Sequence, residues 1–146
     1  GYNSRLDALQ AAVLRAKLPH LEAWSEGRRR NAAYYDAALA DVPEVRTPVI
    51  DPANTSIYNQ YTVRAERRDA LQEFLKARGI GTAVYYPLPL HLQPCFAYLG
   101  YQAGQCPEAE RAAGEVLSLP VFPELTTAQL DEVVAGVRAF YGRPGA

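Results

Sequence analysis

The opening stretch of the chain, GYNSRLDALQAAVLRAKL, places two versatile polar side chains just before a helical pattern. Asn3 and Arg5 lie outside the start of that helix, where a turn can direct them at an anion or at a partner. Ser4 is expected to be the N-cap, with Asp7 three residues on, as in a capping box. Because capping boxes are common, an ordinary surface helix is the simpler interpretation of these residues alone.

A second candidate site lies in the proline-rich segment 87–94, PLPLHLQP, and in the two tyrosines before it. Its prolines exclude a regular helix or a central strand and favour a rigid, extended loop. Tyr85, Tyr86 and His91 could face a ligand from this loop, since a tyrosine can hydrogen-bond a sugar hydroxyl and offer a flat face to a ring. Packing within the loop explains Tyr86 and His91 equally well. His91 is not a metal candidate, because no second ligand lies at a usable spacing.

The composition of the chain argues against several classes of protein. A net charge of −1 gives no electrostatic case for binding nucleic acid or an anionic membrane. No apolar run is long enough to span a bilayer, and we expect no signal peptide in this stretch. Cys95 and Cys106 form neither a metal pattern nor a disulfide framework, which favours reduced thiols and predicts a cytoplasmic protein. The run from Arg28 to Arg30 is predicted to be a solvated helix face, because consecutive residues fan around a helix.

Helical periodicity dominates the first part of the chain. Leucines and alanines at helical spacing predict a helix from residue 6, and Pro19 is expected to break or kink it at Leu18. A second, long amphipathic helix should follow and end before Pro43. The start of the chain is therefore expected to be a long kinked helix.

The remainder mixes strand and helix patterns. We predict strands at 45–47, 57–64 and 82–86, and helices at 68–78, 107–117 and from Thr126 to Phe140. Gly79 should end the first of these helices, and Gln129 should complete a capping box that opens the last. Residues 118–123 are expected to be an apolar connector. Together these elements predict an α/β (α+β) fold, in which a small, mostly antiparallel three-stranded sheet is packed with helices.

Four stretches, in the same order, resemble the DegT/StrS family of sugar-nucleotide aminotransferases, which depend on pyridoxal phosphate (PLP). They are the opening segment quoted above, IYNQYTVRAERRDAL, GIGTAVYYPLPLHLQP and PEAERAAGEVLSLPVFPELT. The resemblance covers nearly the whole chain and implies the C-terminal part of a fold-type I PLP enzyme. Residues 1–42 would be an interdomain and dimer-interface loop with its helices. Residues 43–146 would be the small C-terminal α/β domain, and the large domain with the PLP lysine would be absent.

The resemblance also implies roles for the candidate residues. In the family, the segment matching Asn3 and Arg5 crosses the dimer interface into the neighbouring site. The residue at Asn3 donates to the cofactor phosphate, and the residue at Arg5 lies near the substrate or donor carboxylate, as an amide and a guanidinium fork are suited to do. Tyr85, Tyr86 and His91 match the loop that contacts the sugar nucleotide. The family often has histidine where this sequence has Tyr85, so the role of Tyr85 stays open.

By this resemblance, the whole enzyme would be a homodimer that transfers an amino group from glutamate to a nucleotide-linked keto-sugar for surface polysaccharides. The only lysines here, Lys17 and Lys76, have ordinary helix-surface spacing, and neither falls where the family places its PLP-binding lysine. That lysine is expected before Gly1. The chain alone is therefore predicted to contain no catalytic residue, to be inactive and not to hold PLP.

Two alternatives stay open at this point. A dehydratase branch of the same family replaces the lysine with histidine, at a position that this chain does not include. A stand-alone, non-catalytic module that binds a partner or a sugar nucleotide would leave apolar helix faces uncovered and should self-associate.

Overall fold

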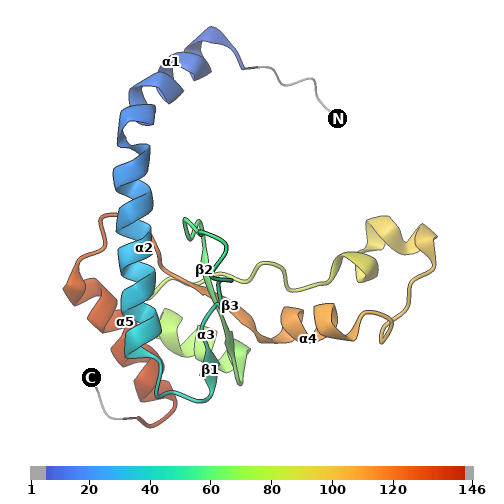
Figure 1. The fold of residues 1–146 in the computed structure, drawn as a ribbon. Helices are drawn as coiled ribbons and strands as arrows, with labels where there is room; N and C mark the ends of the chain where they lie inside the picture. Colours follow the sequence, from blue (N-terminus) through green and yellow to red (C-terminus); the bar gives the residue numbers. More distant parts are fainter. Residues whose placement is uncertain (1–5, 144–146) are drawn as a thin grey trace.

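A long helical rod begins the chain and runs beside a small sheet in the computed structural model, which describes residues 6–143 (Figure 1). The rod consists of α1 (Ala8–Lys17), a 3₁₀ turn η1 (Leu18–His20) and α2 (Leu21–Ala38). Pro19 lies in that turn, which confirms the predicted interruption of the helix. The predicted N-cap was wrong. Asp7 rather than Ser4 caps α1, because its carboxylate accepts the amide of Gln10 at 2.7 Å, the three-residue spacing that an N-cap uses.

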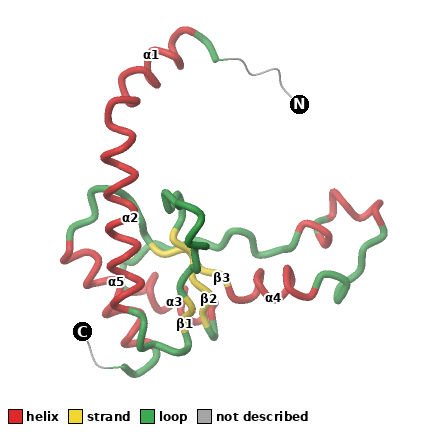
Figure 2. Tube along the Cα trace, in the orientation of Figure 1, coloured by secondary structure: helices red, strands yellow, loops and turns green. Residues whose placement is uncertain are grey.

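The sheet has three antiparallel strands, as the sequence predicted, and their order is β1-β2-β3 (Figure 2). They are β1 (Val45–Arg46), β2 (Tyr61–Ala65) and β3 (Val116–Leu119). The third strand was predicted in the wrong place. Residues 82–86 contribute only an isolated bridge from Ala83 to Ser118. The segment predicted as a helix end and a connector pairs with β2 instead, because it buries Leu117, Ser118 and Leu119 in succession.

The central strand β2 also begins later than expected. Tyr58 has a φ of 46°, outside the extended region, and so the chain turns before it enters the sheet. Tyr61 and Val63 then point to the same buried face, as their alternation predicted.

Helices cover the sheet and extend from it. They are α3 (Arg68–Ala77), α4 (Pro107–Glu115) and α5 (Thr127–Phe140), with 3₁₀ segments η2 (Leu90–Leu92) and η3 (Pro94–Leu99) on an arm that projects from the sheet (Figure 1). The predicted end of α3 and the predicted start of α5 are confirmed. Gly79 follows α3 with a φ of 76°, and Thr126 with Gln129 forms the capping box of α5.

One hydrophobic core joins α2, α3 and α5 to the inner face of the sheet. At its centre the rings of Tyr35 and Tyr61 lie 5.1 Å apart, and both residues are fully buried. The Tyr35 hydroxyl donates to the carbonyl of Pro120 at 2.9 Å, and the Tyr61 hydroxyl donates to Asp36 at 2.6 Å. Burial raises the pKa of both phenols, so they stay protonated donors at any physiological pH.

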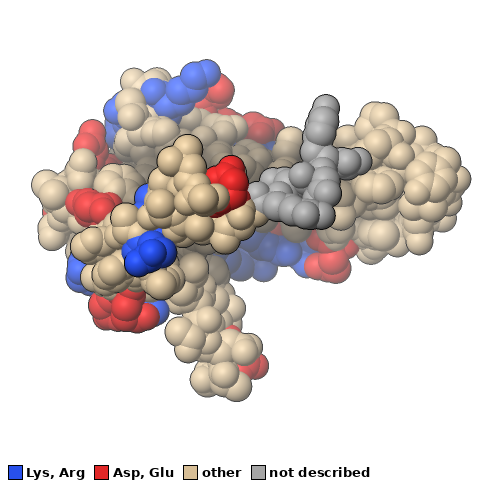
Figure 3. Space-filling model, turned by 90° about the horizontal axis from the view of Figure 1, so that it is seen from above, with Lys and Arg blue, Asp and Glu red and all other residues tan. Residues whose placement is uncertain are grey.

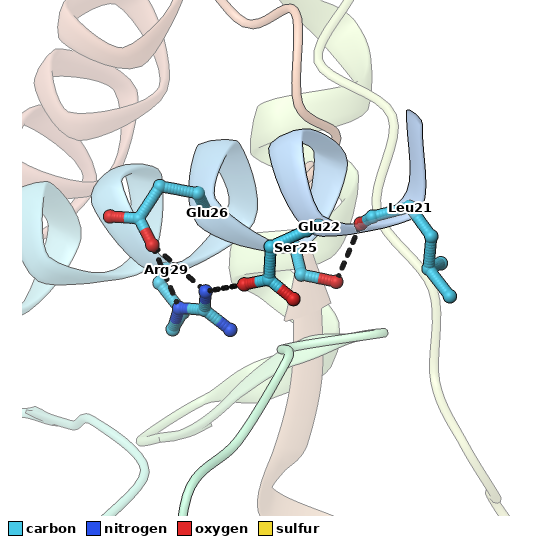
Figure 4. A network of polar contacts seen from close by, with 5 residues as sticks. All are labelled: Leu21, Glu22, Ser25, Glu26 and Arg29. Carbon is cyan, nitrogen blue, oxygen red and sulfur yellow. Dashed lines mark hydrogen bonds and ion pairs between the residues drawn. The ribbon is translucent and has the colours of Figure 1, made fainter. Parts of the chain in front are cut away.

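The three arginines on α2 make contacts in different directions, and Arg28 departs from the predicted solvated helix face. Arg29 pairs with Glu22 at 2.6 Å and with Glu26 at 2.8 Å along the outside of the helix (Figure 4). Arg28 and Arg30 instead donate to backbone carbonyls of other segments, Arg30 to that of Pro123 at 3.2 Å. Arg30 nevertheless stays exposed, so the prediction of a solvated run was wrong for Arg28, which is half-buried against those segments.

Gly27 allows α2 to approach the segment after β3 closely. A Cβ at this position would lie 2.9 Å from the carbonyl oxygen of Pro123, a backbone atom that cannot move aside cheaply. We expect Gly27→Ala to destabilise the fold by about 1–3 kcal/mol through overpacking, although alanine is the better helix former. Urea unfolding would measure this effect. Gly114→Ala in α4, where nothing lies within 4 Å, is the matched control. Equal stability of the two variants would contradict the close contact.

The apolar residues of α1 and of its two ends do not reach this core. Leu6, Leu9, Val13, Leu14 and Leu18 are between 49% and 77% exposed. Within residues 6–143, no helix combines the length and the apolar character that a bilayer span requires. The first turns of the rod therefore present an uncovered apolar face.

Candidate functional site

Asn3 and Arg5, the two candidates in the opening loop, lie outside the described residues. Their roles therefore stay predictions.

Tyr85 and Tyr86 lie on the segment that leaves the sheet for the projecting arm. Two backbone hydrogen bonds with Ser118 fix Ala83, at 2.7 and 3.1 Å, and so anchor this segment beside β3. Beyond that anchor the two tyrosines are 46% and 70% exposed, and their rings meet edge to face with centroids 5.8 Å apart. The structure thus brings these two candidates together outside the core, with both rings accessible to a ligand.

A cavity of about 300 Å³ lies at the base of this segment. Tyr85 borders it together with Asn59, Gln60, Ser118 and Val121. Side-chain amides and a phenol are groups that hydrogen-bond sugar hydroxyls. The sequence predicted Asn59 and Gln60 to lie in a strand and did not identify them as site residues. Two adjacent amides directly before a buried strand were the signal that could have indicated this site.

Arg28 of α2 holds the walls of this cavity at a fixed separation. Its guanidinium donates to the carbonyl of Val121 at 2.9 Å and to the carbonyls of Tyr58 and Asn59, both at 3.3 Å. Since these carbonyls belong to two segments far apart in the sequence, one side chain ties both to the helical rod.

His91 lies in a different environment from the tyrosines. Its side chain is only 9% exposed, and Nε2 lies 3.0 Å from a carboxylate oxygen of Glu110 on α4. The ring of Tyr101 meets the imidazole edge to face at 6.2 Å. Among the described residues, no hydrogen bond or ring contact joins His91 to Tyr85 or Tyr86.

Glu110, which sequence reasoning missed, is the acceptor at the centre of this second group. It also accepts the amide of Gly104 at 2.9 Å and that of Cys106 at 3.2 Å. The pKa of this carboxyl is lowered, mainly by the hydrogen bond from the Gly104 amide. Glu110 is therefore ionised at neutral pH. Gly104 and Cys106 lie in the turn before α4, but His91 lies nineteen residues away, and no spacing in the sequence signals that contact.

A PLP site calls for two kinds of group. Covalent attachment of PLP needs a lysine amine, and the phosphate needs donors around it. Lys76 is 75% exposed and lies 3.8 Å from Glu73, and Lys17 is exposed at the end of α1. The residue assigned to the phosphate, Asn3, is outside the described range. Within residues 6–143, no group of three or more His, Cys, Asp or Glu residues is placed to hold a metal ion.

Charge is distributed unevenly along the molecule. Figure 3 shows positive and negative side chains interspersed over the main body, whereas the lobe at its right carries almost none. Residues 79–107 contain no Lys, Arg, Asp or Glu. The arm therefore offers aromatic and neutral polar contacts, which suit a sugar or a ring better than they suit a phosphate.

Comparisons with known proteins agree on one family. The model of the DegT/DnrJ/EryC1/StrS aminotransferase family matches residues 1–138. A pleiotropic regulatory protein of Geobacillus stearothermophilus is 55% identical over 145 residues, which are 97% of this chain and 38% of that protein. A dTDP-3-amino-3,4,6-trideoxy-alpha-D-glucose transaminase of Streptomyces venezuelae is 45% identical over 143 residues, 98% of this chain and 38% of that protein.

The fold leads to the same family. The structure is similar to that of S. venezuelae DesV in complex with a ketimine intermediate, with a TM-score of 0.92 and 44% identity over 99% of this chain and 39% of that chain. The chain thus spans about 38% of the length of the two curated relatives. From sequence and fold together, the chain belongs to the DegT/DnrJ/EryC1/StrS family of PLP-dependent aminotransferases.

Proposed function

We propose that the protein to which this chain belongs transfers an amino group from glutamate to a keto group on a nucleotide-linked sugar. The observation that carries the proposal is the 45% identity, over 98% of this chain, to a transaminase named for a dTDP-linked amino sugar. The chain would supply the C-terminal part of that enzyme. Residues 1–42 would form the interdomain and dimer-interface segment, and 43–146 the small domain. We further propose a cytoplasmic homodimer that serves surface polysaccharide synthesis.

We assign the candidate residues to two parts of this enzyme's site. Asn3 would donate to the PLP phosphate and Arg5 would grip a carboxylate with two parallel hydrogen bonds, both in the neighbouring subunit. Tyr85, Tyr86 and His91 would contact the nucleotide-linked sugar. The exposed tyrosine rings and the absence of charged residues over 79–107 support the second assignment.

The proposal is tested with the protein encoded by the complete reading frame. Loaded with PLP, it should release at most about one equivalent of 2-oxoglutarate per active site from glutamate alone, and should continue to turn glutamate over only when a dTDP- or UDP-linked keto-sugar accepts the amino group. Mass spectrometry should then show the amino sugar. Loss of water from the sugar without amino transfer would identify a dehydratase instead and overturn the proposal.

The uncovered face of α1 makes a prediction about the isolated 146-residue chain. Because its apolar side chains have no partner in this fold, we expect the chain to self-associate as its concentration rises. Light scattering at several concentrations would measure this. The variant Leu9→Lys with Val13→Lys, which changes only exposed positions on that face, should scatter as a monomer. A wild-type chain that stays monomeric at every concentration would contradict the prediction.

A further inference from the structure

The carboxylate of Glu110 accepts hydrogen bonds from three donors, which lie in two other parts of the chain. One comes from the imidazole of His91 on η2, and the others come from the amides of Gly104 and Cys106 in the turn before α4. Glu110 itself lies in the first turn of α4. A single side chain therefore connects the projecting arm, the turn at its end and the helix that returns to the sheet.

The charge of Glu110 determines which nitrogen of His91 carries a proton. An ionised carboxylate can only accept hydrogen bonds, and at 3.0 Å the Nε2 atom must therefore donate. In the neutral imidazole only one nitrogen carries hydrogen, so Nδ1 is then left as an acceptor.

The Nδ1 atom is left for a further contact. Within residues 6–143 the ring makes no second hydrogen bond, and its edge-to-face contact with Tyr101 uses no hydrogen-bonding atom. The side chain keeps 9% of its surface exposed.

We propose that Glu110 is a positioning residue, which fixes His91 in the Nε2-protonated form and presents Nδ1 to a hydrogen-bond donor of the ligand. This inference rests on the proposed role of His91 toward a nucleotide-linked sugar. It narrows that role, because a neutral Nδ1 accepts from a sugar hydroxyl or a base N–H and does not bind a phosphate oxygen. The alternative is that Glu110 only stabilises the turn before α4. The test must distinguish this structural role from the positioning role.

The tautomer is measured directly in the 146-residue chain. Long-range ¹H–¹⁵N spectra recorded in alkaline buffer distinguish a protonated ring nitrogen from an unprotonated one. His20, which is exposed, is the internal reference. We expect His91 to be protonated at Nε2. A ring protonated at Nδ1 would overturn the proposal without the need for any variant.

Variants then separate positioning from folding. Glu110→Gln removes the charge, and Glu108→Gln, in the same helical turn and paired with Arg111, is the matched control. In the complete protein we expect Glu110→Gln to lower kcat/KM for the nucleotide-linked sugar about 5- to 10-fold, the effect of losing one hydrogen bond, and to leave kcat/KM for glutamate unchanged. Glu108→Gln should change neither. Equal losses for both substrates would show a structural role and overturn the proposal.

Failure of this inference is distinguishable from failure of the proposed function. If the complete protein aminates a nucleotide-linked sugar but Glu110→Gln has no selective effect, the inference fails and the function stands. If no amino transfer occurs at all, the proposed function fails, while the tautomer measurement still reports on the pair of Glu110 and His91.

Discussion

The 146-residue chain, incubated with PLP, glutamate and a dTDP- or UDP-linked keto-sugar, is expected to show no steady formation of amino sugar. Transamination with PLP needs a lysine amine that holds the cofactor and later moves the proton. Lys17 and Lys76 are the only lysines of the chain, and both are exposed on helix surfaces. Neither is placed beside Tyr85 or His91 by any contact among the described residues. We therefore expect no catalytic turnover by this chain.

The measurement is the release of 2-oxoglutarate from glutamate over many equivalents of chain. The double variant Lys17→Ala with Lys76→Ala gives the background, since free PLP reacts slowly with amino acids on its own. Steady turnover by the wild-type chain, abolished in the double variant, would show that one of these lysines is catalytic. It would also contradict the assignment of the amine to another part of the protein.

Replacing Tyr35 by alanine is expected to have the largest effect on stability. The side chain is fully buried, packs against Tyr61 and donates to the carbonyl of Pro120. Its removal would leave a cavity and an unpaired carbonyl, with an expected cost of about 3–5 kcal/mol. Domains of this size have a total stability of only about 5–15 kcal/mol, so the variant should be largely unfolded at moderate temperature.

Urea unfolding followed by circular dichroism would test this. Tyr35→Phe keeps the ring and loses only the hydroxyl, so we expect about 1–3 kcal/mol from the unpaired Pro120 carbonyl. Tyr98→Ala removes a tyrosine that is 81% exposed and should lie within about 0.5 kcal/mol of wild type. A Tyr35→Ala variant that is as stable as Tyr98→Ala would contradict the burial of Tyr35 in the core.

Much of the fold was predictable because its signals are local. Pro19 interrupts the rod, Gly79 ends α3 and the pair of Thr126 and Gln129 opens α5, each through the geometry of one or two residues. The third strand was not predictable in this way. β3 is short and is buried at three successive positions, so it shows no alternation, and the helical pattern of residues 107–115 runs directly into it. Only pairing with β2 makes it a strand.

The candidate site was predictable in part for the same reason. The prolines around His91 predicted a rigid, extended loop whose side chains could face a ligand, and Tyr85 and Tyr86 beside it are exposed. The contact between His91 and Glu110 spans nineteen residues and depends on the turn that Gly104 makes with a φ of 90°. Such a contact follows from tertiary structure rather than from spacing.

We propose that this chain lines the site and that another part of the protein supplies the amine. The most direct test locates the lysine that binds PLP. The protein from the complete reading frame is loaded with PLP, reduced with borohydride and mapped by peptide mass spectrometry. We predict one pyridoxyl group per chain, on a lysine outside these 146 residues, in a protein that aminates a nucleotide-linked keto-sugar. A pyridoxyl group on Lys17 or Lys76 of the active protein would contradict the proposal.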